Sequence, residues 1–218
     1  MQDADTIMEF LNLWWEIQHV QLNDQPDTIR WRWTANGQYS ARSAYMIQCK
    51  GSYCQFDATA LWKAKAEGKQ KFHVWLALQN RILTADKLLK RNCPCNANCP
   101  FCDQANETAD HISLECTYAK QVWLGISRWR QNDIYTTGDQ SQGLKEWWND
   151  VMAKFRKKEK NEVAAVIIYT LWNLWKERNR RTFQNQSLQP NQVVKMVKEE
   201  MQMRELAYGQ HQVAQQQL

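Results

Sequence analysis

Three cysteines and one histidine between residues 99 and 116 have the spacing of a metal site. Cys99 and Cys102 are two residues apart, His111 follows after eight more residues, and Cys116 follows after another four. Thiolate and imidazole are the ligands that zinc prefers, and four of them in a tetrahedron make a closed, structural site. The pattern therefore predicts one structural Zn²⁺. The alternative interpretation is three buried thiols and a surface histidine.

The spacing of the last two residues limits the elements that carry them. Each residue of an α-helix turns by about 100°, so His111 and Cys116 would lie roughly 140° apart on one uninterrupted helix. We therefore expect His111 near the end of one helical turn and Cys116 at the start of the next helix. Thr108 is expected to cap the turn before His111, and Thr84 to cap a helix that starts at Ala85.

The rest of the chain predicts a mainly α fold (α+β in class). It has only seven glycines and four prolines in 218 residues, which favours helices over a β-fold with many turns. Residues 28–33 alternate between apolar and basic, and Asn36-Gly37 follows, which predicts an N-terminal β-hairpin. Zinc-stapled helices and a C-terminal helical hairpin or bundle complete the expected fold. Apolar periodicity places helices at 4–20, 40–47, 58–66, 71–83, 85–91, 117–130, 144–158, 163–183 and 193–207.

These elements predict four regions. Residues 1–25 form an amphipathic helix and a linker, and residues 26–130 contain the hairpin and the metal site. A polar loop at 131–143 suggests a boundary before a helical region at 144–208. The Gln-rich residues 209–218 have little apolar content and are expected to be disordered.

Charge is distributed unevenly along the chain. Residues 1–30 carry a net charge of −5, so the rest carries +10 to reach the total of +5. Two basic runs, at 69–91 and 154–160, could hold phosphates while exposed aromatic side chains stack on unpaired bases. The alternative is that both runs are solvated helix faces. The candidate nucleic-acid contacts are Lys69, Lys71, Arg81, Lys90, Arg91, Arg156, Lys157 and Lys158.

Two further residues are expected to be structural. Arg178 lies near the apolar stripe of its helix, which predicts a packed and paired arginine. His73 is a lone histidine on a predicted helix.

Composition limits the class of protein further. No run of about 18 apolar residues exists, so no membrane segment is expected. The acidic start of the chain lacks the basic region of a secretory signal. Seven cysteines in such a chain indicate a reducing compartment, and therefore an intracellular location, nuclear or cytoplasmic.

Several motifs together resemble a known family. In order, they are Trp33-x3-Gly37-x-Tyr39-Ser40-x2-Ser43-Ala44-Tyr45, Trp75, Arg81-Ile82, Cys99-x2-Cys102, Glu107-Thr108, His111, Cys116 and Trp123. This resembles the zinc-binding domain downstream of reverse transcriptase in plant non-LTR (LINE-type) retrotransposons and in stand-alone plant proteins derived from them. A later segment, Leu171-Trp172-x2-Trp175-Lys176-x-Arg178-Asn179-x2-Thr182-Phe183, is similar to the region downstream of that domain in such polyproteins.

The resemblance implies that residues 26–130 are a domain of this type and that its zinc ligands are Cys99, Cys102, His111 and Cys116. Cys93 and Cys95 depart from the family pattern and could compete for the metal, but a single residue separates them. The chain lacks an aromatic-x-Asp-Asp polymerase signature and a spread of four acids typical of ribonuclease H. We therefore expect no enzymatic activity.

Two functional hypotheses remain open. The resemblance implies a zinc-stabilised module that binds nucleic acid, RNA in preference. The alternative is a domesticated protein-interaction module that uses residues 1–25, where Phe10, Trp14 and Trp15 lie on an acidic helix.

Overall fold

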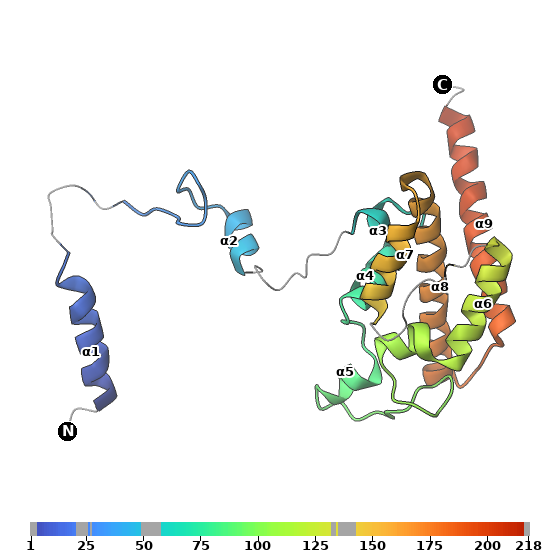
Figure 1. Cartoon of the computed structure of the whole chain (residues 1–218), viewed down its shortest axis with the longest axis horizontal. Coiled ribbons are helices and arrows are strands. Elements are labelled where there is room, and N and C mark those ends of the chain that lie inside the picture. The colour runs from blue at the N-terminus through green and yellow to red at the C-terminus, as the bar shows by residue number, and fades with distance from the viewer. Residues whose placement is uncertain are drawn as a thin grey trace. The chain divides into compact units, whose positions relative to one another are not determined.

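The computed structural model describes residues 4–20, 26, 28–48, 58–131, 134 and 143–215. The chain divides into two compact units, Met1–Phe56 and Asp57–Leu218, which we call unit 1 and unit 2. The fold is mainly helical, as predicted, and no strand occurs among the described residues (Figure 1).

The described part of unit 1 contains α1 (Ala4–Ile17) and α2 (Ala41–Gln48). Ser40 caps α2, because its hydroxyl accepts a hydrogen bond from the Ser43 amide at 3.1 Å. The apolar side chains of α1 are exposed, including Trp15 at 71%. The described residues of unit 1 therefore form no core around α1.

The predicted N-terminal hairpin is wrong. The Trp31 amide donates to the Gly37 carbonyl at 2.7 Å. Between these two residues, however, the Thr34 amide donates to the Trp31 carbonyl and the Thr34 carbonyl accepts from the Gly37 amide, which is a pair of turns and not a strand ladder. The Asn36 side chain accepts from the Gln38 amide at 3.1 Å, so Asn36-Gly37 does not form the two central residues of a hairpin turn. A compact loop results, in which the rings of Trp31 and Tyr39 meet edge to face.

Unit 2 contains the remaining helices and the candidate metal site. In chain order the helices are α3 (Thr59–Lys63), α4 (Gly68–Leu78), α5 (Ala85–Leu89), the π-helical turn η1 (His111–Glu115), α6 (Thr117–Arg130), α7 (Leu144–Lys154), α8 (Lys157–Gln184) and α9 (Pro190–Gln215). The predicted bounds of α6 agree with the structure. Gly68 begins α4, three residues before the expected start. Thr84 occupies the N-cap position of α5 as expected, but its hydroxyl donates to the Asp86 carboxylate at 2.6 Å and makes no capping bond to the helix backbone.

α8 lies at the centre of unit 2. Its residues from Val163 to Leu171 are buried on all sides, which is typical of a helix surrounded by other elements. α3, α4, α6, α9 and η1 all contact it, and α8 and α9 form the predicted C-terminal hairpin (Figure 1). The fully buried Trp123 and Trp147, whose ring centroids are 5.2 Å apart, fill the core beside it.

Several predicted helix ends need correction. The helix expected at 71–83 ends at Leu78 and is followed by a turn in which Asn80 is left-handed (φ 53°). The helix expected at 144–158 ends at Lys154, because Phe155 and Arg156 are extended and the Glu159 side chain caps the start of α8. α9 continues to Gln215, so the tail expected to be disordered is helical as far as that residue. Glutamine and alanine are adequate helix formers and extend the helix. Residues 216–218 lie outside the described residues.

The predicted boundary at 131–143 is also not where the units divide. The compact units meet at residues 56 and 57, within the region 26–130 that was expected to be one domain. The reason is tertiary packing: α6 contacts α9 and η1 contacts α8, which joins the metal-site region to the C-terminal helices.

Candidate metal centre

A short turn at residues 99–105, which we call the knuckle, holds the first two candidate ligands, Cys99 and Cys102. The Cys99 amide donates to the Ala105 carbonyl at 2.7 Å, and the Asp103 amide donates back to the Cys99 carbonyl at 2.8 Å. Asp103 adopts the left-handed conformation that the tight turn requires (φ 53°). The Phe101 amide donates to the Cys99 sulfur at 3.4 Å, so the backbone stabilises negative charge there.

η1 brings the other two candidate ligands to the same place. The Cys116 amide donates to the His111 carbonyl at 2.8 Å, an i→i+5 bond that widens the turn. Residues five apart thereby approach one another, which an α-helix would prevent. His111 thus begins a π-helical turn, where we expected it near the end of an α-helical one, and Cys116 is the N-cap residue of α6 as predicted. The Thr108 hydroxyl accepts from the His111 amide at 3.0 Å, which confirms that cap.

The four side chains converge on one point. The ligand atoms of Cys99, Cys102, His111 and Cys116 all lie within 4.8 Å of one another. The sulfurs of Cys99 and Cys116 are 3.9 Å apart, and the Cys102 sulfur is 3.4 Å from Nε2 of His111. Tetrahedral zinc with Zn–S bonds of about 2.3 Å separates its ligand atoms by about 3.5–3.8 Å. The cluster therefore fits one structural zinc, which would fill all four positions with protein ligands and leave none for chemistry.

The local electrostatics favour a thiolate at Cys116. The pKa of Cys116 is lowered to about 5, chiefly by a hydrogen bond from the Cys99 thiol and, against the effect of burial, also by the backbone amides of Tyr118 and Ala119 at the start of α6. The same thiol–thiol bond, together with burial, raises the pKa of Cys99. Zinc binding would remove this proton, since both sulfurs bind metal as thiolates.

His111 has a partner on its other ring nitrogen. Its Nδ1 lies 3.6 Å from Oε2 of Glu115, while Nε2 faces the sulfurs. A carboxylate on the far nitrogen of a metal-binding histidine fixes the ring orientation. Glu115 therefore lies on the side of the His111 ring opposite the sulfurs, where a small approach would let it hold the ring in place.

Cys93 and Cys95 lie outside this cluster. Both are exposed, and their sulfurs contact the backbone carbonyls of Arg91 and Ala85. Among the described residues, the group of side chains that could hold a metal consists of Cys99, Cys102, His111 and Cys116.

Comparison with protein families agrees with this geometry. Residues 39–123 match the family described as zinc-binding in reverse transcriptase. Residues 39–123 are therefore similar to a reverse-transcriptase zinc-binding domain. The resemblance inferred from the sequence is thereby confirmed.

A curated relative extends the similarity. The chain is 23% identical over 177 residues to a putative ribonuclease H protein of Arabidopsis thaliana, a match that covers 79% of this chain and 28% of the relative. The chain thus spans little more than a quarter of that protein. This similarity is consistent with a retrotransposon-derived protein. No solved structure gives a significant match.

A buried ion pair ties the zinc-binding domain to α8. Both Glu107 carboxylate oxygens accept from Arg178, at 2.6 Å to Nε and 2.9 Å to Nη2, and the two side chains are 3% and 6% exposed. Glu107 also accepts from the Ala85 amide at 3.2 Å, at the start of α5. The prediction of a packed, paired Arg178 is confirmed. Its partner lies 71 residues away, and sequence reasoning did not find it.

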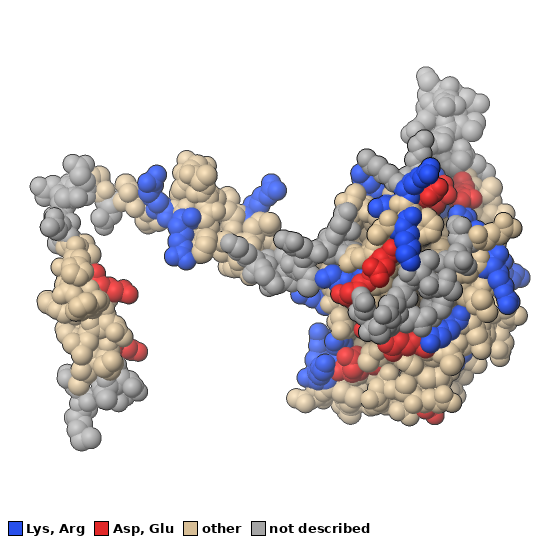
Figure 2. Space-filling model, viewed as in Figure 1, with Lys and Arg blue, Asp and Glu red and all other residues tan. Residues whose placement is uncertain are grey.

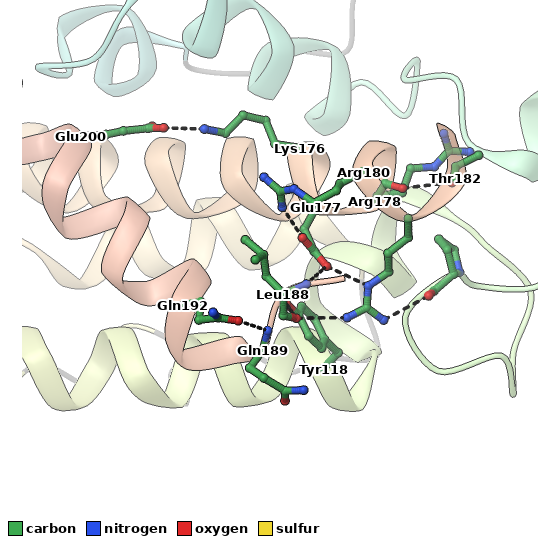
Figure 3. A network of polar contacts seen from close by, with 12 residues as sticks. Tyr118, Lys176, Glu177, Arg178, Arg180, Thr182, Leu188, Gln189, Gln192 and Glu200 are labelled. Atoms are coloured by element: carbon green, nitrogen blue, oxygen red, sulfur yellow. Dashed lines mark hydrogen bonds and ion pairs between the residues drawn. The ribbon is translucent and has the colours of Figure 1, made fainter. Parts of the chain in front are cut away.

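A second network joins the knuckle to the turn between α8 and α9 (Figure 3). The Arg181 guanidinium donates to the Pro100 and Phe101 carbonyls at 3.1 and 3.2 Å and to the Leu188 carbonyl at 3.3 Å. The buried Glu177 carboxylate holds Arg181 at 2.8 Å and also accepts from the Leu188 amide at 2.8 Å. The knuckle is therefore bonded directly to the C-terminal helices.

The candidate phosphate contacts lie in different settings. Arg81, Lys90, Arg91 and Arg156 are exposed and form no ion pair among the described residues. Lys69 is exposed, with its ammonium 6.0 Å from the Trp172 ring. Lys71 donates to the Trp62 carbonyl, and burial, followed by repulsion from Arg204, lowers its pKa. The side chains of Lys157 and Lys158 lie outside the described residues.

The structure adds a basic site that the sequence did not indicate. The guanidinium of Arg130 and the ammonium of Lys198 each lie 5.4 Å from the centroid of the Trp129 ring. Trp129 belongs to α6 and Lys198 to α9, so this contact connects the two helices. An open groove between these helices is lined in part by Arg128 and Lys195. The cations come from two helices far apart in sequence, so no run of basic residues reveals them. On the visible face of unit 2, basic and acidic groups are interspersed (Figure 2).

Among the described residues, no helix is long and apolar enough to cross a membrane.

Proposed function

We propose that the chain is a non-catalytic module in which Cys99, Cys102, His111 and Cys116 bind one structural zinc, and that the module binds nucleic acid, RNA in preference. The observation that carries the proposal is the exposed cationic segment beside the knuckle. Arg81, Lys90 and Arg91 have no acidic partner among the described residues. Unpaired surface cations of this kind bind the phosphate groups of a nucleic-acid backbone and release its counterions.

Two features support the absence of catalysis. A four-ligand zinc site has no open position for a substrate or a reactive water. Hydrolysis of nucleic acid by two metals needs clustered carboxylates. The described residues contain the Cys₃His group and no cluster of three carboxylates. The ribonuclease H in the name of the Arabidopsis relative belongs to a protein of which this chain spans 28%.

Salt-dependent binding tests the nucleic-acid hypothesis. A fluorescein-labelled single-stranded RNA is titrated with the zinc-loaded chain, and anisotropy gives Kd at a series of salt concentrations. Three phosphate contacts predict a slope of about −2 in log affinity against log salt. Neutralising Arg81, Lys90 and Arg91 to glutamine should remove most of that slope.

The matched control neutralises three cations elsewhere on unit 2, at Arg128, Lys195 and Lys198. It makes the same change in net charge and should leave the slope near its original value. An equal loss in both variants would show that binding follows overall charge and not this segment, and absence of binding at low salt would refute the hypothesis.

A second candidate function, docking to a protein partner, is favoured by α1. Its large apolar side chains occupy a wide arc of the helix and are all exposed, while Glu9 and Glu16 lie in the narrow polar stripe. Such a helix fits an apolar groove with a basic rim. A partner retained from cell extract is purified and titrated against the chain. Binding that survives a Trp14→Ala/Trp15→Ala substitution would contradict this hypothesis.

A further inference from the structure

A cleft lies between the knuckle and the C-terminal end of α8. Its volume is about 820 Å³, within the range of about 300–1,000 Å³ of small-ligand sites. We call it the knuckle cleft. Its lining includes Leu88, Pro94, Asn98, Trp175, Asn179 and Phe183.

The cleft has an unusually exposed aromatic wall. Phe183 is 75% exposed although it belongs to α8, the most buried helix of unit 2. The guanidinium of Arg178 lies 5.8 Å from the Phe183 ring and 5.2 Å from the Trp175 ring. An exposed ring beside a packed cation provides a flat apolar surface on which a planar ligand can stack. Every nucleobase has such a face, so stacking of this kind tolerates any sequence.

Side-chain amides provide polar groups in the same cleft. The Oδ1 of Asn179 accepts from Arg178, and the Nδ2 of Asn98 donates to Asp103. Among the described residues, this leaves the Nδ2 of Asn179 and the Oδ1 of Asn98 without a protein partner. One is a donor and the other an acceptor, a combination that suits the edge of a base.

The charges place a phosphate backbone outside the cleft and not within it. The lining residue Arg178 is neutralised by Glu107, and the lining carboxylate of Asp103 is bonded to Asn98. Lys90 and Arg91 are exposed and lie in the turn that connects the lining residues Leu88 and Pro94. The lining residue Arg181 is likewise paired, with Glu177. Unpaired cations are therefore found in the segment next to the lining, whereas the lining itself is aromatic and amide-rich.

From this arrangement we infer that the knuckle cleft binds an unpaired nucleobase of single-stranded RNA, with Phe183 as the stacking platform and Lys90 and Arg91 holding the flanking phosphates. A base inside a duplex already stacks on both faces, whereas an unpaired base is free to enter. This inference rests on the proposed nucleic-acid function and specifies its ligand and its site.

The test compares single-stranded and duplex RNA on the zinc-loaded full chain. A short fluorescein-labelled oligouridine is titrated alone and after annealing to its complement, and anisotropy gives both affinities. Phe183→Ala should weaken binding of the single strand by about 5- to 150-fold, the value of one stacked base. Binding of the duplex and the salt slope should not change. Phe183→Trp should retain binding, since it keeps an aromatic platform.

Controls separate this inference from the proposed function. Phe10→Ala removes an exposed phenylalanine ring from unit 1 and should change neither the single-strand nor the duplex affinity. Zinc content and the midpoint of urea unfolding show whether Phe183→Ala keeps the fold. If the wild-type chain binds no RNA, the proposed function fails. If it binds RNA but Phe183→Ala has no effect, or weakens the duplex equally, the knuckle cleft is not the site.

Discussion

The buried pair of Glu107 and Arg178 should be the most sensitive polar contact of unit 2. Each side chain is less than a tenth exposed, and two short hydrogen bonds join them. Removing one partner of a buried ion pair leaves the other charge uncompensated, which costs about 3–5 kcal/mol. Such a loss approaches the whole stability of an ordinary domain, about 5–15 kcal/mol.

The measurement is a double-mutant cycle with Glu107→Gln, Arg178→Met and the double variant. Urea unfolding at saturating zinc, followed by tryptophan fluorescence, reports on the buried indoles of the core. Each single change should lower the free energy of unfolding by about 3–5 kcal/mol. The double variant should lose at least about 2 kcal/mol less than the sum, because neither charge is then left alone.

A surface pair provides the control. Lys195 and Glu199 lie 3.6 Å apart on α9 with side chains 76% and 56% exposed. Glu199→Gln should cost less than about 0.5 kcal/mol, as exposed helical pairs do. The reasoning would be refuted if the Glu107 and Arg178 variants lost no more than this control, or if their effects were additive.

Three further predictions concern other parts of unit 2. Gly125→Ala places its Cβ 2.7 Å from a Val194 methyl carbon, and this clash should outweigh the gain in helix propensity of about 1 kcal/mol and lower the midpoint of urea unfolding. In a Val194→Ala background the same change should raise the midpoint, because the clashing methyl group is gone. Burial lowers the pKa of His73 from 6.5 to about 4, so the unfolded chain takes up the proton at a higher pH than the folded chain. Between pH 7.5 and 5 the free energy of unfolding should therefore fall by about 2 kcal/mol more for wild type than for His73→Gln, and equal losses would exclude this role. Cys116→Ser should abolish zinc binding measured by elemental analysis and prevent cooperative folding, since structural zinc contributes on the order of 10 kcal/mol, whereas Cys95→Ser should retain one zinc per chain.

Local sequence patterns were sufficient for much of the fold and of the metal centre. The ligand cluster follows from spacing, because a knuckle and one turn bring it together without distant contacts. The bounds of α6 follow from an uninterrupted apolar stripe after Cys116. The burial of Arg178 follows from its helical angle.

The remaining features depend on contacts that a local pattern does not encode. The partner of Arg178 is 71 residues away, and the cations beside Trp129 come from two helices. The hairpin prediction failed because an Asn36 side-chain bond formed a different turn. The extended Arg156, which separates α7 from α8, divides a basic run that looks continuous in the sequence.

The bonds between the knuckle and α8 restrict how this protein can be divided or recombined. The match to the zinc-binding family ends at residue 123, yet Glu107 needs Arg178, and the Pro100 and Phe101 carbonyls need Arg181. A gene breakpoint after residue 123 would leave a buried carboxylate without its counter-ion and expose the apolar face that α8 covers. A fragment of this protein that keeps these bonds and this packing must therefore extend from α3 through α9.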